Sequence, residues 1–173
     1  MGNNASNYTI ITVTPTMNTG VAYAAADVLF NPVEIPNAVR GGAGCSLLRS
    51  VSIFNQDDTV LDIDLIFMSV SKDLGTINDV VGSGSKWSNA LAEAALICGV
   101  VRCDASDGNT DLINNQLWTM SGATGNAANH HLPLMLQANA GSTSVFVAGV
   151  LRDGTPTFTA ADDIDLILHI QYK

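Results

Sequence analysis

The stretch VLDIDLIFMSV, residues 60–70, carries the clearest structural signal in the chain. Apolar side chains occupy every second position from Leu61 to Phe67, and Asp62 and Asp64 fall between them. Because side chains along a strand alternate between its two faces, this spacing predicts a strand with one buried and one solvent-facing side. Half-buried strands of this kind are typical of antiparallel sheets.

The same alternation returns in the stretch IDLILHIQY at residues 164–172, where acidic and polar residues separate the apolar ones. Shorter β-branched or apolar segments are bounded by Gly, Pro, Asn and Asp, which favour turns. These segments predict further strands at residues 8–14, 28–34, 45–54, 97–103, 112–120, 132–137 and 144–151. One helix is expected at Trp87–Leu96, with Ser88 as its N-cap.

Many short strands with a single helix predict an all-β fold, namely a jelly-roll-like β-sandwich with one short helix and an extended N-terminal segment. An α/β fold is disfavoured because the crossover helices are missing. The length of 173 residues fits one domain, which we assign to residues 21–173. Residues 1–20 have two interpretations: an arm that pairs with a neighbouring subunit's sheet edge, or an ordinary first strand.

The composition is poor in charge, with 13% charged and 47% hydrophobic residues. Soluble domains typically carry about 25% charged residues, and charge is depleted where one subunit contacts another. The net charge of −9 argues against nucleic acid and anionic membranes as partners. No stretch reaches the roughly 18 apolar residues of a membrane span, and the N-terminus lacks the features of a signal peptide.

The three cysteines, Cys45, Cys98 and Cys103, form no CxxC motif. An odd count without such a motif favours a reducing compartment. Cys98 and Cys103 are five positions apart, so on one strand they point to opposite faces and cannot pair. We expect buried, inert thiols.

The histidines are weak candidates for a metal or catalytic site. His130 and His131 are adjacent in an Asn/Ala-rich loop, so their side chains point in different directions and favour a surface or subunit contact. His169 is expected on the outer face of the last strand together with Asp163 and Asp165, but strand spacing spreads these groups too far apart for one site.

Two loops have features of ligand-binding loops. In the segment Asp104–Asp111, the residues Asp107, Asn109 and Asp111 alternate as oxygen donors do in calcium loops. The twelve-residue EF-hand pattern is absent, so a solvated turn is favoured and calcium bridging between subunits stays open as the alternative. Gly41–Gly44 precedes a strand and lacks the helix and Lys of a phosphate-binding loop, so it is interpreted as a plain loop.

Catalytic motifs are absent from the sequence. There is no Gly-x-Ser-x-Gly elbow. The remaining acidic pairs sit in turns without an apolar pocket: Asp57, Asp58, Asp162 and Asp163. We therefore predict that the protein is not an enzyme, and assign no catalytic, cofactor-binding or metal-binding residues. Enzymatic function would require folding to bring one of the paired histidines beside the acidic loop.

Two parts of the chain resemble a known family. The first part comprises Phe30–Gly42, Ser50–Ile53 and Asp64–Met68, and the second comprises Gly141–Val150 and Pro156–Asp163. Together they resemble small virion proteins of tailed bacteriophages, especially capsid decoration (cement) proteins. The motifs concern packing and turns, and they include no catalytic signature.

This resemblance implies a homotrimer that binds the major capsid protein on the outside of the capsid lattice and stabilises it. It also implies assembly in the host cytoplasm and a final location in the virion, which suits unpaired cysteines. We expect the loops at residues 36–44 and 121–131 to make contacts at an end of the sandwich.

Two alternatives remain open at this point. One is a phage tail or baseplate component, which shares the fold and differs in its partner. The other is a virion-displayed jelly-roll module that binds glycans, which would require exposed aromatic side chains over a shallow groove. Its candidates are Trp87, Trp118 and Tyr23.

Overall fold

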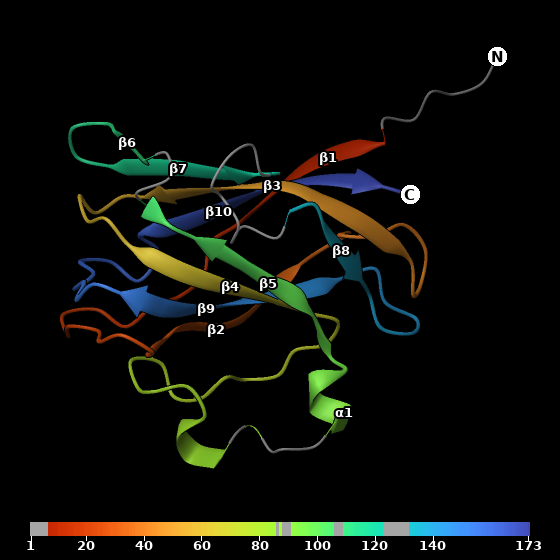
Figure 1. Cartoon of the computed structure of the whole chain (residues 1–173), viewed down its shortest axis with the longest axis horizontal. Coiled ribbons are helices and arrows are strands. Elements are labelled where there is room, and N and C mark those ends of the chain that lie inside the picture. The colour runs from red at the N-terminus through yellow and green to blue at the C-terminus, as the bar shows by residue number, and fades with distance from the viewer. Residues whose placement is uncertain (1–6, 86, 88–90, 106–108, 123–131) are drawn as a thin grey trace.

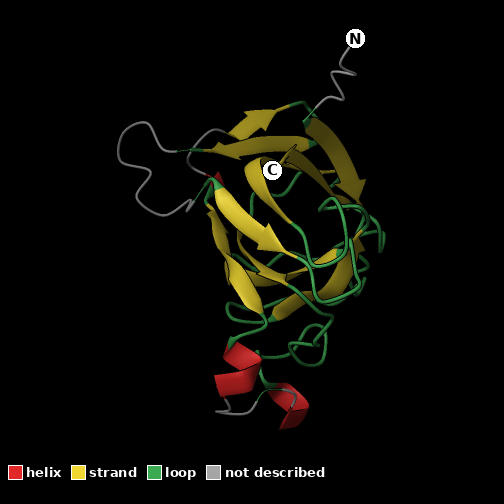
Figure 2. Ribbon diagram, turned by 90° about the vertical axis from the view of Figure 1, so that its right-hand side faces the viewer, coloured by secondary structure: helices red, strands yellow, loops and turns green. Residues whose placement is uncertain are grey.

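The protein folds as two antiparallel β-sheets packed face to face, as seen in a computed structural model (Figures 1 and 2). The structure describes residues 7–85, 87, 91–105, 109–122 and 132–173. The first sheet has the order β1 (Tyr8–Val13), β10 (Ile164–Tyr172), β3 (Cys45–Asn55), β7 (Gln116–Ser121) and β6 (Asn109–Asp111), and β8 (Leu134–Gln137) also pairs with β3. The second has the order β2 (Val28–Ile35), β9 (Val145–Asp153), β4 (Asp62–Met68) and β5 (Ile97–Cys103).

The strand connections follow the pattern of a jelly roll. The early strands pair in turn with the late ones: β1 with β10, β2 with β9, β3 with β7 and β8, and β4 with β5. The chain is thus a long antiparallel ribbon rolled into two sheets, the arrangement of jelly-roll sandwiches. The predicted all-β sandwich with one short helix is confirmed.

The main core lies between the sheets and is built by alternation along the strands. In β4, Ile63, Leu65 and Phe67 are fully buried, whereas Asp62 and Asp64 lie on the outer side. β10 shows the same pattern along its length. The largest fully buried side chains include Trp118, Tyr23, Phe30, Phe67 and Phe158. The period of two predicted for both strands is confirmed.

A second, smaller core lies outside the four-stranded sheet. The long connection between β4 and β5 runs beneath this sheet and contains the 3₁₀ turn Ser83–Ser85 and α1 (Leu91–Ala94) (Figure 1). Its Leu74 packs on outer-face residues that are themselves fully buried. The members of this satellite core are Val28, Met68, Leu74 and Ala148, with Ile66, Ile77, Trp87 and Val150 packed against it.

Two predicted elements differ from the structure. Within the described residues, the helix predicted at Trp87–Leu96 is the single turn Leu91–Ala94, and Ser88 lies outside them. The strand predicted at residues 112–120 is instead part of a hairpin in which β6 pairs with β7. Its turn includes Ile113 at a φ of 79°, a left-handed conformation that a continuous strand cannot contain.

The N-terminal segment is integrated into the domain over the residues that the structure describes. Tyr8–Val13 pairs along its whole length with β10 of the same chain. Beyond it, Met17 N donates to Ala161 O at 2.9 Å, and Gly20 N donates to Phe158 O at 3.1 Å. Residues 8–20 therefore agree with the second interpretation, an ordinary first strand and its continuation. Residues 1–6 lie outside the described part.

Candidate interaction surface

The outer face of the six-stranded sheet is here called the open face. Because directly paired residues of antiparallel strands share a face, the strand registers define its rows of side chains. One row holds Ile10, His169 and Ser50, and the next holds Thr12, Ile167 and Ser52. The face comprises Tyr8, Ile10, Thr12, Cys45, Leu47, Ser50, Ser52, Phe54, Thr110, Leu117, Thr119, Ser121, Met135, Gln137, Asp165, Ile167, His169 and Gln171.

Apolar and uncharged polar side chains dominate the open face. Asp165 and His169 are the only acidic or basic residues among these paired positions, and Arg49 lies at the bulge of β3 beside them. Asp165 accepts a hydrogen bond from the Thr14 hydroxyl. Ser52 and Thr119 join their hydroxyl groups at 2.7 Å across the β3–β7 pair. A surface with so few charges has the composition of a subunit contact.

The outer face of the four-stranded sheet, here called the covered face, has a different character. One end lies under the satellite core, and the other carries a network of ion pairs. Arg152 Nη2 lies 3.2 Å from Asp62 Oδ2 and also contacts Asp104, while Arg152 Nε lies 3.7 Å from Asp64 Oδ1. Arg102 Nε donates to Asp64 Oδ1 at 3.1 Å. The aspartates of this network are therefore paired with arginines of the same chain.

The acidic loop at residues 104–111 does not converge on one point in its described part. Asp104 pairs with Arg152, whereas Asp111 Oδ1 accepts from the Ile113 N–H at 2.7 Å. Asn109 donates to Gln116 Oε1 at 2.6 Å. Asp107 lies outside the described residues. Among the residues that are described, no group of three or more His, Cys, Asp or Glu side chains is placed to hold a metal ion.

The histidines and their acidic neighbours are likewise separate. His169 lies in the middle of the open face between Ile10 and Ser50, while Asp163 bonds to a turn at the end of the sandwich. Asp165, in contrast, shares the open face with His169, four positions earlier on β10. His130 and His131 lie outside the described residues, as does most of the loop at residues 121–131.

Sequence reasoning missed one pair of carboxyl groups. Asp57 and Asp163 meet at Thr159, whose N–H donates to an oxygen of each carboxyl group at 3.0 Å. The Ala160 N–H adds a bond of 2.7 Å to Asp163. Burial raises the pKa of Asp163, and the neighbouring Asp57 raises it further. The two residues are 106 positions apart in the chain, so no local sequence motif predicts that they meet.

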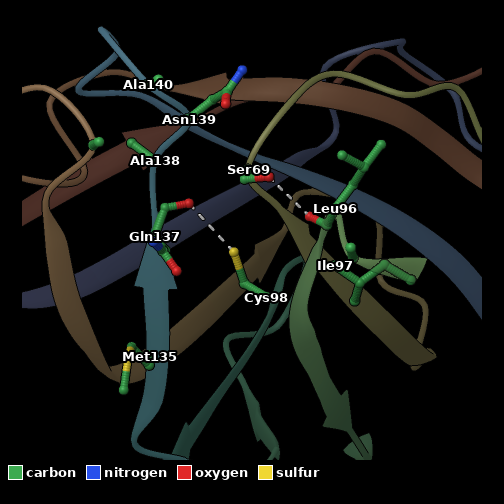
Figure 3. Close-up of a pocket in the computed structure, with 11 residues that line it drawn as sticks. Ser69, Leu96, Ile97, Cys98, Met135, Gln137, Ala138, Asn139 and Ala140 are labelled. Carbon is green, nitrogen blue, oxygen red and sulfur yellow. Dashed lines mark hydrogen bonds between the residues drawn. The ribbon is translucent and has the colours of Figure 1, made fainter. Parts of the chain in front are cut away.

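An open cavity of about 500 Å³ lies between β5 and β8 (Figure 3). Cys98 points across it toward Gln137, with Sγ 3.6 Å from the Gln137 carbonyl oxygen. Met135 and Leu96 supply apolar lining. Burial raises the pKa of the Cys98 thiol, so it stays protonated at neutral pH and is a poor nucleophile. Ser69, Gln137 and Asn139 add polar groups to the lining.

The other cysteines and the aromatic candidates are placed as follows. Cys103 is buried and Cys45 is half-buried, and both are free thiols like Cys98. Trp118 and Tyr23 are fully buried in the main core. Trp87 packs on the satellite core, and its Nε1 donates to Asp73 O at 2.8 Å. None of the three aromatic residues forms part of an exposed platform for a glycan.

No family model matches the chain, and no curated protein matches it. In the described part of the chain, no helix has both the length and the apolar character needed to cross a membrane.

Proposed function

We propose that this protein is a structural protein of a bacteriophage virion that decorates the outside of the capsid and stabilises it. The observation that carries the proposal is the open face, a broad sheet surface with almost no charge on a chain whose net charge is −9. The jelly-roll sandwich and the resemblance of the sequence to decoration proteins support the same role. The partners are the major capsid protein and further copies of this chain, with a trimer as the expected form.

The physical argument concerns where the charges lie. The covered face pairs its aspartates with Arg102 and Arg152, so it needs no partner to satisfy them. The open face leaves Ile10 exposed to 63% and Met135 to 53%, and nothing in the described chain covers them. Burial of apolar surface against a partner gains free energy roughly in proportion to the area removed from water. A protein whose task is to hold neighbouring capsid subunits together depends on that gain.

The test is attachment to expanded capsids that lack decoration protein, measured as copies bound per capsid. Deletion of residues 1–20 is unsuitable because it removes β1 from the sheet, so a point substitution is preferred. We expect Ile167→Lys, in the middle of the open face, to reduce occupancy strongly. The matched control is Val80→Lys, at an exposed position of the β4–β5 connection, and it should leave occupancy unchanged.

Mass in solution gives a second readout for the same proposal. A stable mass near three times 18.1 kDa supports the decoration trimer. A ring of six or more copies supports the alternative of a tail or baseplate component. Failure of the native chain to bind any capsid lattice would contradict the proposal. Equal occupancy by the Ile167→Lys and Val80→Lys variants would also contradict it.

A further inference from the structure

The edges of the two sheets are protected to different degrees. Exposed edge strands pair readily with other chains, and proteins usually block them with charge, proline, bulges, short length or covering segments. β2 contains Pro32 and Glu34 and two register shifts, and its Val28 N–H donates to Asp79 O in the covering connection. β5 carries Arg102 and lies beside β8, and β6 has only three residues.

In the part of the chain that the structure describes, β1 shows neither charge, proline nor a bulge. Its sequence YTIITV contains no charged residue, proline or glycine, and its pairing with β10 has no bulge. Three of its six residues are β-branched and apolar, and its alternation leaves Ile10 exposed to 63%. Among the edge strands that the structure describes, β1 is therefore the one best suited to pair with another strand.

The hydrogen-bond pattern shows which backbone groups face outward. Tyr172 N donates to Asn7 O at 2.7 Å, which makes these two residues a hydrogen-bonded pair. Such pairs alternate along an antiparallel ladder, so the backbone groups of Ile11 point toward β10. Those of Ile10 and Thr12 therefore point away from β10, toward the edge.

We propose that β1 is a self-association site, where it pairs antiparallel with β1 of a second copy across a two-fold axis at Ile10. This register places Ile10 opposite Ile10 of the second copy, and Tyr8 opposite Thr12. Isologous contacts require a surface that is complementary to itself, and this strand meets that condition. Each copy carries a net charge of −9, and this contact brings no charged side chains opposite one another.

The pairing would join two six-stranded sheets into one continuous sheet, with the two open faces side by side. It goes beyond the proposed function, because it requires only the free protein and no capsid. On a capsid that carries three-fold trimers, a two-fold contact would lie between neighbouring trimers rather than within one.

The first test is site-directed disulfide formation in the full chain. A hydrogen-bonded antiparallel pair has a Cα–Cα separation of about 5.5 Å, within disulfide range. Ile10→Cys should therefore give a covalent dimer on mild oxidation. Tyr8→Cys and Thr12→Cys are the matched controls, because in this register each cysteine lies about 14 Å from the same cysteine of the second copy. Neither variant should form a covalent dimer alone, whereas a mixture of the two should cross-link.

The native chain, oxidised in parallel, is the control for cross-links formed by the three native cysteines. Dimer yields that are equal for the three single variants, with circular dichroism spectra like that of the native chain, would overturn the proposal. So would a mixture of Tyr8→Cys and Thr12→Cys that does not cross-link.

The second test does not depend on disulfide geometry. Ile10→Lys places two positive charges opposite each other on the axis, and should weaken self-association about tenfold or more in sedimentation equilibrium. Ile113→Lys is the control, because Ile113 is 83% exposed in the β6–β7 turn. Self-association equal in both variants would contradict β1 pairing, while capsid occupancy, measured separately, tests the proposed function.

Discussion

The two outer faces of the sandwich differ in how far the chain itself covers them and pairs their charges. The covered face is buried at one end by its own connection and cross-linked at the other by ion pairs. The open face has neither a covering segment in the described chain nor a network of charges. The difference indicates that the covered face contributes to the stability of the single chain, whereas the open face is available to partners.

The largest effect should come from the satellite core. Met68 is fully buried on the covered face, so Met68→Ala should lower the free energy of unfolding by about 2–5 kcal/mol. Ile167→Ala, on the open face, should cost less than about 1 kcal/mol because its side chain is only half-buried. Urea denaturation of both variants measures the difference. Equal losses would show that the two faces do not differ in this respect.

The ion-pair network should come next. Arg152→Met leaves three carboxylates without their shared cation, and should cost about 1–2 kcal/mol. The figure is below that for a fully buried pair because the Arg152 side chain is 28% exposed. Urea denaturation at low and high salt should show the loss shrink as salt rises. A loss that does not respond to salt would point to packing instead.

The carboxyl pair at the end of the sandwich should make stability depend on pH. The pKa of Asp163 is raised in the folded state. Its contribution to the free energy of unfolding is therefore fully present when the pH is below the ordinary pKa of an aspartate. That contribution is lost as pH rises through the folded pKa. Asp163→Asn keeps an acceptor for the Thr159 and Ala160 N–H groups and cannot ionise. Its stability relative to the native chain should therefore increase from about pH 4 to pH 7.

Urea midpoints across this pH range measure the effect, and Asp162→Asn is the control because Asp162 is exposed beside the pair. A difference between Asp163→Asn and the native chain that does not change with pH would contradict the assignment.

The smallest effect should lie on the open face itself. Thr119→Val keeps a β-branched side chain and removes the hydroxyl that bonds to Ser52. The free energy of unfolding should fall by about 0.5–1 kcal/mol, because the Ser52 hydroxyl loses its hydrogen-bond partner. Adding Ser52→Ala should recover part of it, which a double-mutant cycle measures. Full additivity of the two changes would show that the hydroxyl pair contributes nothing.

The sequence predicted best where the signal was local. The alternation at residues 60–70 and 164–172 established two strands and the side on which Asp62 and Asp64 lie. The β6–β7 hairpin was missed because the apolar residues around Ile113 obscured the turn at Asn114.

The tertiary features were not accessible in the same way. Asp62 pairs with Arg152 from β9, 90 positions away, and Asp57 meets Asp163 from the far end of the chain. Residues 1–20 fitted both an arm and a strand, because an unpaired edge and a paired strand have the same β-branched composition. Only the pairing with β10 distinguishes them over the described residues.

The position of β10 has a consequence for how the chain is made. β10 lies between β1 and β3, so β1 has no sheet partner until residues 164–172 have left the ribosome. Until then, the nascent chain holds an uncharged, β-branched segment in an unpaired state. Pairings this distant give a high contact order, and such all-β domains fold in milliseconds to seconds. During synthesis, the same segment is therefore a site for premature contact between chains on neighbouring ribosomes.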